Sequence, residues 1–230
     1  MKYIASVSFG KDSLAMLLII LQNPKKYPLD EVIFYDTGME FKAIYDIRDS
    51  ISLILKEKGI KYTELHPQKS FIDWMINYPH LSRNGVLKQG YGWCGGLCRW
   101  GTTEKVRTID KYCGDNHQYI GLAYDEPKRL EKLSNNKSSP LAEEKLTEKD
   151  ALNICYENGF YYKENGIRLY DILKRVSCWC CRNKNLKELA NYKKYFPKYF
   201  LNLCQLEEII GEPMKKPYFL KDRFKEEITE

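Results

Sequence analysis

The sequence has little of what marks membrane, secreted or fibrous proteins. Its longest unbroken apolar run is Leu14 to Leu21, eight residues, less than half of the roughly 20 residues that span a bilayer. Lys11 and Asp12 directly precede this run and no small-residue cleavage site follows it, so it does not read as a signal peptide. Internal repeats and low-complexity segments are absent. We therefore expect a soluble cytoplasmic protein without membrane association.

Histidine is scarce, and the three residues His66, His80 and His117 have no ligand spacing to one another. We expect structural roles for all three. Cysteine is not scarce: the chain has eight. In a reducing compartment these are more often buried thiols, metal ligands or reactive groups than disulfides.

Length and composition indicate an ordinary globular protein. A chain of 230 residues is expected to form one domain, or one domain with an appendage. Hydrophobic residues make up 43% and charged residues 30%, which argues against disorder or a coiled coil. The net charge is +6, and the segment from residue 174 to the end holds 13 basic and 8 acidic residues. The basic excess therefore belongs to the C-terminal part.

Strands and helices alternate in the first half of the sequence. Short apolar stretches predict strands at residues 1–7, 31–36, 61–65 and 118–123, and longer periodic stretches predict helices at 13–21, 41–58 and 102–112. Such alternation predicts an α/β fold with a parallel sheet and helices on both faces. Ligands of these sheets bind outside the carboxyl ends of the strands.

Composition divides the chain into three parts. Residues 1–130 form the predicted nucleotide-binding core, and residues 131–150 are polar and read as a mobile loop or linker. Residues 151–230 form a helical C-terminal part. The helices expected from here on are 147–158, capped by Thr147, then 185–194 and 198–210.

A short glycine-containing loop follows the first predicted strand. It reads Ser8-Phe9-Gly10-Lys11-Asp12-Ser13. Gly10 allows the backbone to approach an anion, Lys11 supplies positive charge, and backbone N–H groups converge at the start of the next helix. The spacing is not that of a Walker loop. A plain strand-to-helix turn is the alternative, but the position in a parallel sheet favours a phosphate-binding loop.

Three motifs resemble one protein superfamily. The Ser8 to Ser13 loop is similar to the PP-loop of the N-type ATP pyrophosphatases, also called adenine nucleotide alpha-hydrolases. The segment Asp36-Thr37-Gly38-Met39-Glu40-Phe41 resembles the matching motif of the phosphoadenosine phosphosulfate (PAPS) reductase branch. Gly121-Leu122-Ala123-Tyr124-Asp125-Glu126, with Arg129 behind it, resembles the third nucleotide-site segment of that branch. The three motifs occur in order at the ends of three predicted strands.

The resemblance implies a five-stranded Rossmann-like sheet that binds ATP or a PAPS-like adenine nucleotide with Mg²⁺. It also implies in-line attack on the α-phosphate with release of pyrophosphate, in which Lys11 and Asp12 are the catalytic candidates. It further places Asp36 near the ribose or a metal ion and Arg129 near the anionic end of the substrate. The implied nucleotide contacts are Ser8, Gly10, Lys11, Asp12, Ser13, Asp36 and Arg129.

The cysteines form two compact groups about 80 residues apart. One is Trp93-Cys94-Gly95-Gly96-Leu97-Cys98, and the other is Ser177-Cys178-Trp179-Cys180-Cys181. Ligand spacing in both predicts a four-thiolate site for Zn²⁺ or a [4Fe–4S] cluster. We predict Cys94, Cys98, Cys178 and Cys181 as ligands that clamp the C-terminal part to the core, with Cys180 as the alternative to Cys181. Gly95 and Gly96 would permit tight wrapping around an ion.

The resemblance also bears on the cysteines. Cysteine pairs hold a four-iron cluster in adenylylsulfate reductases and in the sulfurtransferases of DNA phosphorothioation, and the arrangement here is similar. The reductases carry a catalytic cysteine in a C-terminal Glu-Cys-Gly motif. This chain has no such motif and no cysteine after Cys204, which argues against reductase activity. We expect the isolated Cys113, Cys155 and Cys204 to be buried.

The segment 174–198 combines lysines and arginines with Trp179, Tyr192, Tyr195 and Phe196. It either tracks a phosphate backbone and stacks on bases, or it is a solvated helix with its aromatic side chains in the core.

Three functions follow from these observations. The leading one is a PP-loop enzyme that adenylates a substrate with pyrophosphate release, for sulfur transfer. The first alternative is a sulfonucleotide reductase with Cys180 as nucleophile, and the second is a zinc-stapled nucleic-acid-binding module with a vestigial nucleotide site. The leading function implies two further partners: a nucleic-acid acceptor, tRNA or DNA, and a sulfur donor such as a cysteine desulfurase.

Overall fold

The computed structural model describes residues 1–82, 84–94 and 98–225. These residues form two compact units, and each unit is made of several segments. Unit 1 contains residues 1–36, 41–66 and 105–162, and unit 2 contains residues 37–40, 67–104 and 163–230. The motif at residues 36–41 is therefore divided, because Thr37–Glu40 belong to unit 2.

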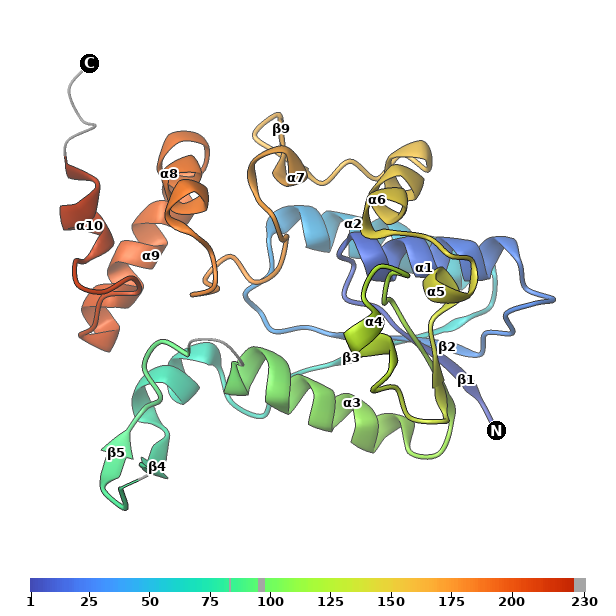
Figure 1. Ribbon diagram of the computed structural model, residues 1–230, viewed down its shortest axis with the longest axis horizontal. Coiled ribbons are helices and arrows are strands. Elements are labelled where there is room, and N and C mark those ends of the chain that lie inside the picture. Colours follow the sequence, from blue (N-terminus) through green and yellow to red (C-terminus); the bar gives the residue numbers. More distant parts are fainter. Residues whose placement is uncertain (83, 95–97, 226–230) are drawn as a thin grey trace. The chain divides into compact units, whose positions relative to one another are not determined.

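A five-stranded parallel sheet forms the centre of unit 1 (Figure 1). Its strand order is β3-β2-β1-β6-β7, and every neighbouring pair is parallel. The strands are β1 (Tyr3–Ser6), β2 (Glu31–Tyr35), β3 (Lys61–Leu65), β6 (His117–Ile120) and β7 (Lys137–Ser138). This confirms the predicted α/β Rossmann-like class with five strands.

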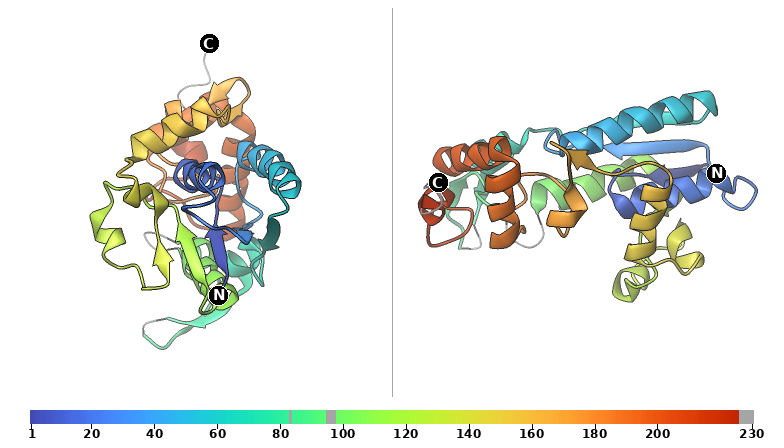
Figure 2. Two further views of the ribbon diagram at one scale, coloured as in Figure 1. Left: turned by 90° about the vertical axis from the view of Figure 1, so that its right-hand side faces the viewer. Right: turned by 90° about the horizontal axis from the view of Figure 1, so that it is seen from above.

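Helices cover both faces of this sheet (Figure 2, left). On one face lie α1 (Lys11–Gln22) and α2 (Lys42–Glu57), with α6 (Glu148–Glu157) packed against α1. The opposite face is covered by α3 (Lys105–Cys113), whose Ile109 and Cys113 pack against Ile4, Ile33 and Tyr35 of the strands. All five residues of β2 are buried, as a strand covered on both faces requires. Most side chains of helix α1 are also buried, since α6 packs against this helix.

The segment 131–150 carries regular structure. It contains β7, α5 (Pro140–Glu143) and the start of α6, and it follows the short helix α4 (Pro127–Leu130). Ser139 is buried and caps α5 by accepting a hydrogen bond from the Ala142 N–H. A polar composition predicted a mobile linker here, but its serines are used in caps and turns. Thr147 caps α6 as predicted, in a capping box with Asp150.

Unit 2 consists of short elements and one helix pair. Helices α8 (Leu186–Tyr195) and α9 (Pro197–Ile210) pack together, and α10 (Leu220–Arg223) packs on α9. Two hairpins pair antiparallel strands, β4 (Pro79–Leu81) with β5 (Leu87–Gln89) and β8 (Lys163–Glu164) with β9 (Ile167–Arg168). The remaining elements are the π-helical turns η1 (Asp73–Asn77) and η2 (Arg99–Glu104), and α7 (Leu169–Ile172). Across the described parts of both units, no helix has the length and apolar character that crossing a membrane requires.

Candidate functional site

The predicted phosphate-binding loop connects β1 to α1 in unit 1. Gly10 is the N-cap residue of α1, and Ser13 lies in the first turn. The Ser13 hydroxyl accepts a hydrogen bond from the Ser8 N–H at 3.1 Å and donates to the Gly10 carbonyl at 3.1 Å. Phe9 adopts a positive φ of 56° with its ring fully buried against Phe34. The buried ring holds the loop in a backbone conformation that non-glycine residues seldom adopt, which is a sign of a built site rather than a plain turn.

Lys11 is the cation of this loop. Its Nζ lies 2.6 Å from Asp12 Oδ1 and 2.7 Å from Glu148 Oε2, and the side chain is about nine-tenths buried. Burial raises the pKa of Asp12, and the negative charges of Glu148 and Glu126 raise it further, while Lys11 lowers it. The arrangement surrounds one ammonium group with carboxylates at the start of a helix, where an anion is otherwise favoured.

Gly121 brings the end of β6 against this loop. A Cβ on Gly121 would lie 2.6 Å from Ser13 Cα and 2.7 Å from Ser13 N. Real Cβ atoms do not approach backbone this closely, so only glycine fits. The predicted third motif therefore packs on the first turn of α1, which places two of the three sequence motifs side by side.

The other predicted nucleotide contacts have partners of their own. Asp36 directly follows β2 and accepts a hydrogen bond from the Tyr45 hydroxyl at 2.8 Å. Arg129 is 62% exposed and forms an ion pair with Glu126 at 2.5 Å. The structure thus brings Ser8, Gly10, Lys11, Asp12 and Ser13 together in one loop, and it pairs Arg129 with a carboxylate of its own motif.

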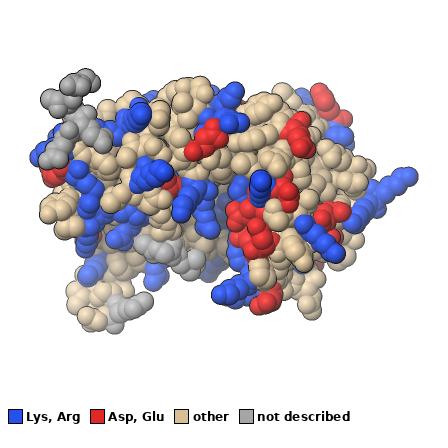
Figure 3. Space-filling model, turned by 45° about the horizontal axis from the view of Figure 1, so that its top comes forward, with Lys and Arg blue, Asp and Glu red and all other residues tan. Residues whose placement is uncertain are grey.

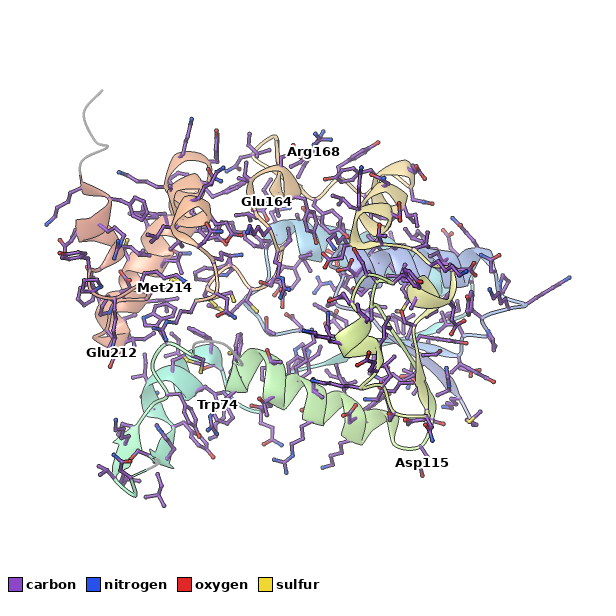
Figure 4. The ribbon with its side chains drawn as sticks, in the orientation of Figure 1. Trp74, Asp115, Glu164, Arg168, Glu212 and Met214 are labelled. Atoms are coloured by element: carbon purple, nitrogen blue, oxygen red, sulfur yellow. The ribbon has the colours of Figure 1, made fainter. Side chains whose placement is uncertain are left out.

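The cysteines converge in unit 2. A pocket of about 120 Å³ is lined by all four predicted ligands and by the aromatic side chains Phe71, Trp93 and Trp100; its cysteines are Cys94, Cys98, Cys178, Cys180 and Cys181. Several sulfur atoms lie around the loop that precedes α8 (Figure 4). Gly95 and Gly96, expected to wrap around an ion, lie outside the described residues.

Backbone and side-chain hydrogen bonds hold the two cysteine segments. The Gly101 N–H donates to Cys98 Sγ at 3.2 Å. Arg182 donates from Nη1 to the Trp93 carbonyl at 2.9 Å and from Nε to the Met214 carbonyl at 3.0 Å. Met214 lies between α9 and α10 (Figure 4). A single guanidinium therefore ties together the two cysteine segments and the turn after α9.

The segment 37–40 lies against the second cysteine group. The Trp179 N–H donates to the Met39 carbonyl at 2.9 Å, and Cys178 Sγ lies 3.7 Å from both Thr37 Oγ1 and Glu40 Oε1. The conformation depends on Gly38, whose φ is 72°. Half of the second motif is thus positioned by the cysteine segment.

The thiols differ in electrostatic character. A hydrogen bond from Cys98 lowers the pKa of Cys94 to about 6, with help from the Arg99 N–H and the charges of Arg99 and Arg182. The same bond raises the pKa of Cys98, the donor. Cys180 is only 2% exposed, and burial raises its pKa. Thiolate character is therefore favoured at Cys94, whereas buried Cys180 is a poor nucleophile.

Two of the three isolated cysteines, Cys113 and Cys155, are buried as expected, whereas Cys204 is only partly buried. Cys113 and Cys155 are fully buried, and burial raises their pKa values to about 11 and about 12. Cys204 is half-buried, with its pKa raised to about 11.

The segment 174–198 follows the structural alternative. Tyr192 and Phe196 are buried, and Lys184 is 3% exposed with its Nζ bonded to the Arg175 carbonyl at 3.2 Å. Burial lowers the pKa of Lys184, although the nearby thiols counteract this. Lys187, Lys194 and Lys198 are exposed, and Lys and Arg side chains are numerous over the region of α8 to α10 (Figure 3). Of the four aromatic side chains expected to stack on bases, Tyr192 and Phe196 belong to the core, whereas Trp179 and Tyr195 are partly exposed.

Comparison with known proteins identifies the N-terminal part. Residues 2–86 match the family described as phosphoadenosine phosphosulfate reductase domain. Over these residues the chain is similar to that family. An uncharacterized protein of Methanocaldococcus jannaschii is 28% identical over 204 residues, which are 85% of this chain. The chain spans 45% of that protein's length. The solved structure of the U34-tRNA thiolase NcsA from Methanococcus maripaludis with its [4Fe–4S] cluster is 16% identical, with a TM-score of 0.49, covering 96% of this chain and 75% of that one.

All eight cysteines follow residue 86, the last residue of the match to the PAPS reductase domain. Their donor set fits a thiolate-bound metal, since five thiols line one pocket and the charges of Arg99 and Arg182 favour the thiolate form of Cys94. Among the described residues, no group of three or more His, Cys, Asp or Glu side chains has a geometry that could hold a metal ion.

The sequence analysis missed one residue beside the nucleotide loop, Glu148, and one beside the second cysteine group, Glu40. Glu148 pairs with Lys11 from a position 137 residues further along the chain. Its place at the start of α6, directly after a capping threonine, is the ordinary place for a glutamate at a helix N-terminus. Nothing in the sequence distinguishes it. Glu40 was quoted only as part of a motif, and no spacing links it to Cys178.

Proposed function

We propose that the protein is a PP-loop enzyme that binds ATP and adenylates a substrate for sulfur transfer. The observation that supports this best is the Ser8 to Ser13 loop, with Lys11 buried at the helix start and Gly121 closing against Ser13. Such a loop presents backbone N–H groups and an ammonium to phosphate oxygens. The match of residues 2–86 to the PAPS reductase domain is consistent with it.

The proposed chemistry is displacement at the α-phosphorus. A nucleophilic oxygen of the acceptor forms a bond to the α-phosphorus, the bond to the bridging oxygen breaks, and pyrophosphate leaves. A sulfide donor then forms a bond to the activated carbon, the bond from that carbon to the AMP oxygen breaks, and AMP leaves. Lys11 and the loop N–H groups would neutralise charge that develops on the phosphates, and Mg²⁺ would accompany them as in other phosphoryl-transfer sites.

Lys11 must exchange a partner for this to happen. Its ammonium is 2.7 Å from Glu148, whose side chain is 47% exposed. An incoming phosphate would replace Glu148, because the carboxylate can return to solvent at little cost. Asp12 would remain with Lys11 and orient it. The loop is therefore preformed, and only one ion pair needs to change.

The cysteine pocket would hold a thiolate-bound metal centre. Cys94, Cys98, Cys178 and Cys181 are the proposed ligands of a [4Fe–4S] cluster or Zn²⁺, and a cluster held by only three of them would have an open iron site for the transferred sulfur. Cys180 is excluded from a reactive role in this proposal because it is buried with a raised pKa. The same observation weakens the alternative of a reductase with Cys180 as nucleophile.

Two measurements test the proposal. Pyrophosphate release from ATP is assayed with bulk tRNA, with DNA and without an acceptor; the proposal expects acceptor-dependent release that Lys11→Ala abolishes. Lys25→Ala, which changes an exposed lysine beyond the end of α1, is the matched control. Absence of ATP turnover with every acceptor would leave a binding module as the better function. Anaerobic purification with iron, zinc and sulfide analysis then identifies the centre.

A further inference from the structure

Four aromatic side chains cluster in unit 2. The ring centroids of Trp74 and Tyr78 are 4.4 Å apart, those of Tyr78 and Tyr91 5.7 Å, those of Trp74 and Tyr91 5.5 Å, and those of Tyr91 and His80 4.0 Å. The interplanar angles of these pairs are 25°, 19°, 31° and 23°. Trp74, Tyr78 and Tyr91 therefore contact one another as a group of roughly parallel rings, and His80 stacks on Tyr91. We refer to Trp74, Tyr78, His80 and Tyr91 as the aromatic ladder.

The backbone is built to hold this ladder. Trp74 lies in η1 (Figure 4), and Tyr78 directly follows it. The Tyr91 N–H donates to the Trp74 carbonyl at 3.1 Å, which docks the strand end on η1. This docking requires Gly90, because a Cβ there would lie 2.1 Å from the Met75 carbonyl oxygen. The rings are thus positioned by a rare π-helical turn, a feature that is frequent at functional sites.

The ladder lies at the surface beside positive charge. All four side chains are partly exposed. Arg99 lies over the Tyr91 ring at 4.9 Å, and Lys69 lies near the Tyr78 ring at 5.8 Å. Both lysine and arginine at such distances interact favourably with ring faces.

The chain segment that carries the ladder has few acidic residues, although the Glu212 carboxylate lies close to Gly92, next to Tyr91. The segment from residue 67 to residue 104 contains four basic and two acidic residues. Both acids accept hydrogen bonds locally, Asp73 from the Ser70 hydroxyl at 2.7 Å and Glu104 from the Gln68 N–H at 3.4 Å. The surface therefore offers stacked rings and cations together.

Aromatic pairs in the cores of this protein pack differently. The buried pairs Phe71 with Trp100 and Tyr192 with Phe196 meet edge to face, at 72° and 86°. Parallel, partly exposed rings with flanking cations instead have the chemistry of a platform on which bases stack. In the segment 174–198, Tyr192 and Phe196 are buried, and one partly exposed ring, Trp179, stacks on a single partner, Tyr199, at 5.7 Å and 27°.

We propose that the aromatic ladder, with Lys69 and Arg99, binds unpaired bases of a single-stranded nucleic acid. The bases stack on the exposed parts of these rings, and the positive charges of Lys69 and Arg99 face the phosphate backbone. The inference deepens the proposed function by giving its acceptor a chemical class and a binding surface. The identification of this nucleic acid as the acceptor rests on the proposed function. Binding of the nucleic acid at the ladder does not, because it requires no ATP.

Fluorescence anisotropy with labelled 12-residue oligo-U and oligo-dT tests this in the absence of ATP, using the full chain purified anaerobically. The intact protein should bind, and affinity should fall as salt is added. Trp74→Ala should weaken binding about 5- to 150-fold, the effect of losing one stacked base. Trp74→Phe should restore most of the affinity, since Trp74 Nε1 has no hydrogen-bond partner among the described residues. A difference between the two oligonucleotides identifies RNA or DNA as the ligand.

Two further variants keep the test decisive. Lys69→Ala changes an exposed side chain and should reduce the salt dependence by about one charge. Tyr218→Ala is the matched control, because Tyr218 is 58% exposed with Arg223 over its ring at 5.4 Å. Absence of binding by the intact protein, or equal affinities for Trp74→Ala and Tyr218→Ala, would overturn the inference. Oligonucleotide binding without pyrophosphate release would overturn the proposed enzyme and leave the ladder standing.

Discussion

Replacing Gly121 with alanine tests whether the close approach of β6 to α1 builds the nucleotide loop. The added Cβ would lie 2.6 Å from Ser13 Cα, 2.7 Å from Ser13 N and 2.9 Å from the Asp12 carbonyl carbon. These are backbone atoms, which cannot rotate away as a flexible side chain can. Neither backbone segment can move away easily. Strand β6 is paired with β1 and β7, and the start of α1 is held by the hydrogen bond from the Leu14 N–H to the Gly10 carbonyl at 2.9 Å.

The expected cost follows from overpacking. An extra methyl in a packed site costs about 1–3 kcal/mol, and contact with backbone on both sides favours the upper end of that range. Alanine restricts the unfolded chain and returns about 0.4–1 kcal/mol. The net loss of about 2–2.6 kcal/mol corresponds to a fall in Tm of about 4–10 °C for a chain of this size. Displacement of Ser13 should also weaken ATP binding by about tenfold or more.

Thermal unfolding by circular dichroism and ATP titration by calorimetry measure the two effects. Gly101→Ala is the matched control for stability, because the nearest atom to its Cβ would be Cys98 Sγ at 3.6 Å, an ordinary contact distance. A Gly121→Ala protein with the Tm and ATP affinity of the unchanged chain would refute the close packing on which the site rests.

Three further predictions concern the charges and thiols. Glu148→Gln should tighten ATP binding about two- to fivefold, because the phosphate would no longer compete with the Glu148 carboxylate for Lys11, and a partly exposed ion pair contributes up to about 1 kcal/mol. Calorimetric titration measures this affinity. Weaker ATP binding by the variant would show that Glu148 assists the nucleotide instead. Burial raises the pKa of Glu207, which accepts hydrogen bonds from the Met214 and Leu220 N–H groups at 2.6 and 2.7 Å. The folded state therefore binds this proton more tightly than the unfolded state, and the contribution of Glu207 to stability is largest below its unfolded pKa near 4.5 and declines as pH rises through the higher folded value. In urea titrations at pH 4.5 and 7, stability relative to Glu207→Gln should decline toward pH 7; a pH-independent difference would contradict the raised pKa. Cys94→Ala should lose the metal while Cys180→Ala retains it, as measured by metal analysis after anaerobic purification; equal metal content would remove Cys94 from the ligand set.

The sheet could be predicted because its signals are local. Each strand of the core, such as β2 and β3, is a short apolar or β-branched stretch between turn residues, and the structure reproduces 61–65 without change. The fifth strand, β7, has two residues and lies in a polar segment. Its pairing with β6 depends on tertiary context, so the sequence pattern could not reveal it.

The candidate site was predictable only in part for the same reason. The Ser8 to Ser13 loop is contiguous, and its residues are brought together by chain connectivity. Glu148 reaches Lys11 only because α6 packs on α1, and a long-range pairing of that kind leaves no local pattern. The burial of Lys184 and Tyr192 is also tertiary. Composition alone could not show that some of the cations and rings of segment 174–198 are buried. The aromatic ladder could not be predicted either, because its rings are brought together by the docking of Gly90 against η1.

Calorimetric titration of Mg·ATP into the intact protein and into Lys11→Ala tests the central claim most directly, namely that the Ser8 to Ser13 loop binds nucleotide phosphates. A hydrogen bond to a charged group is worth about 1.5–3 kcal/mol, so the account predicts saturable binding that Lys11→Ala weakens about 10- to 150-fold. Equal affinities for the two proteins, or no binding by the intact one, would contradict it.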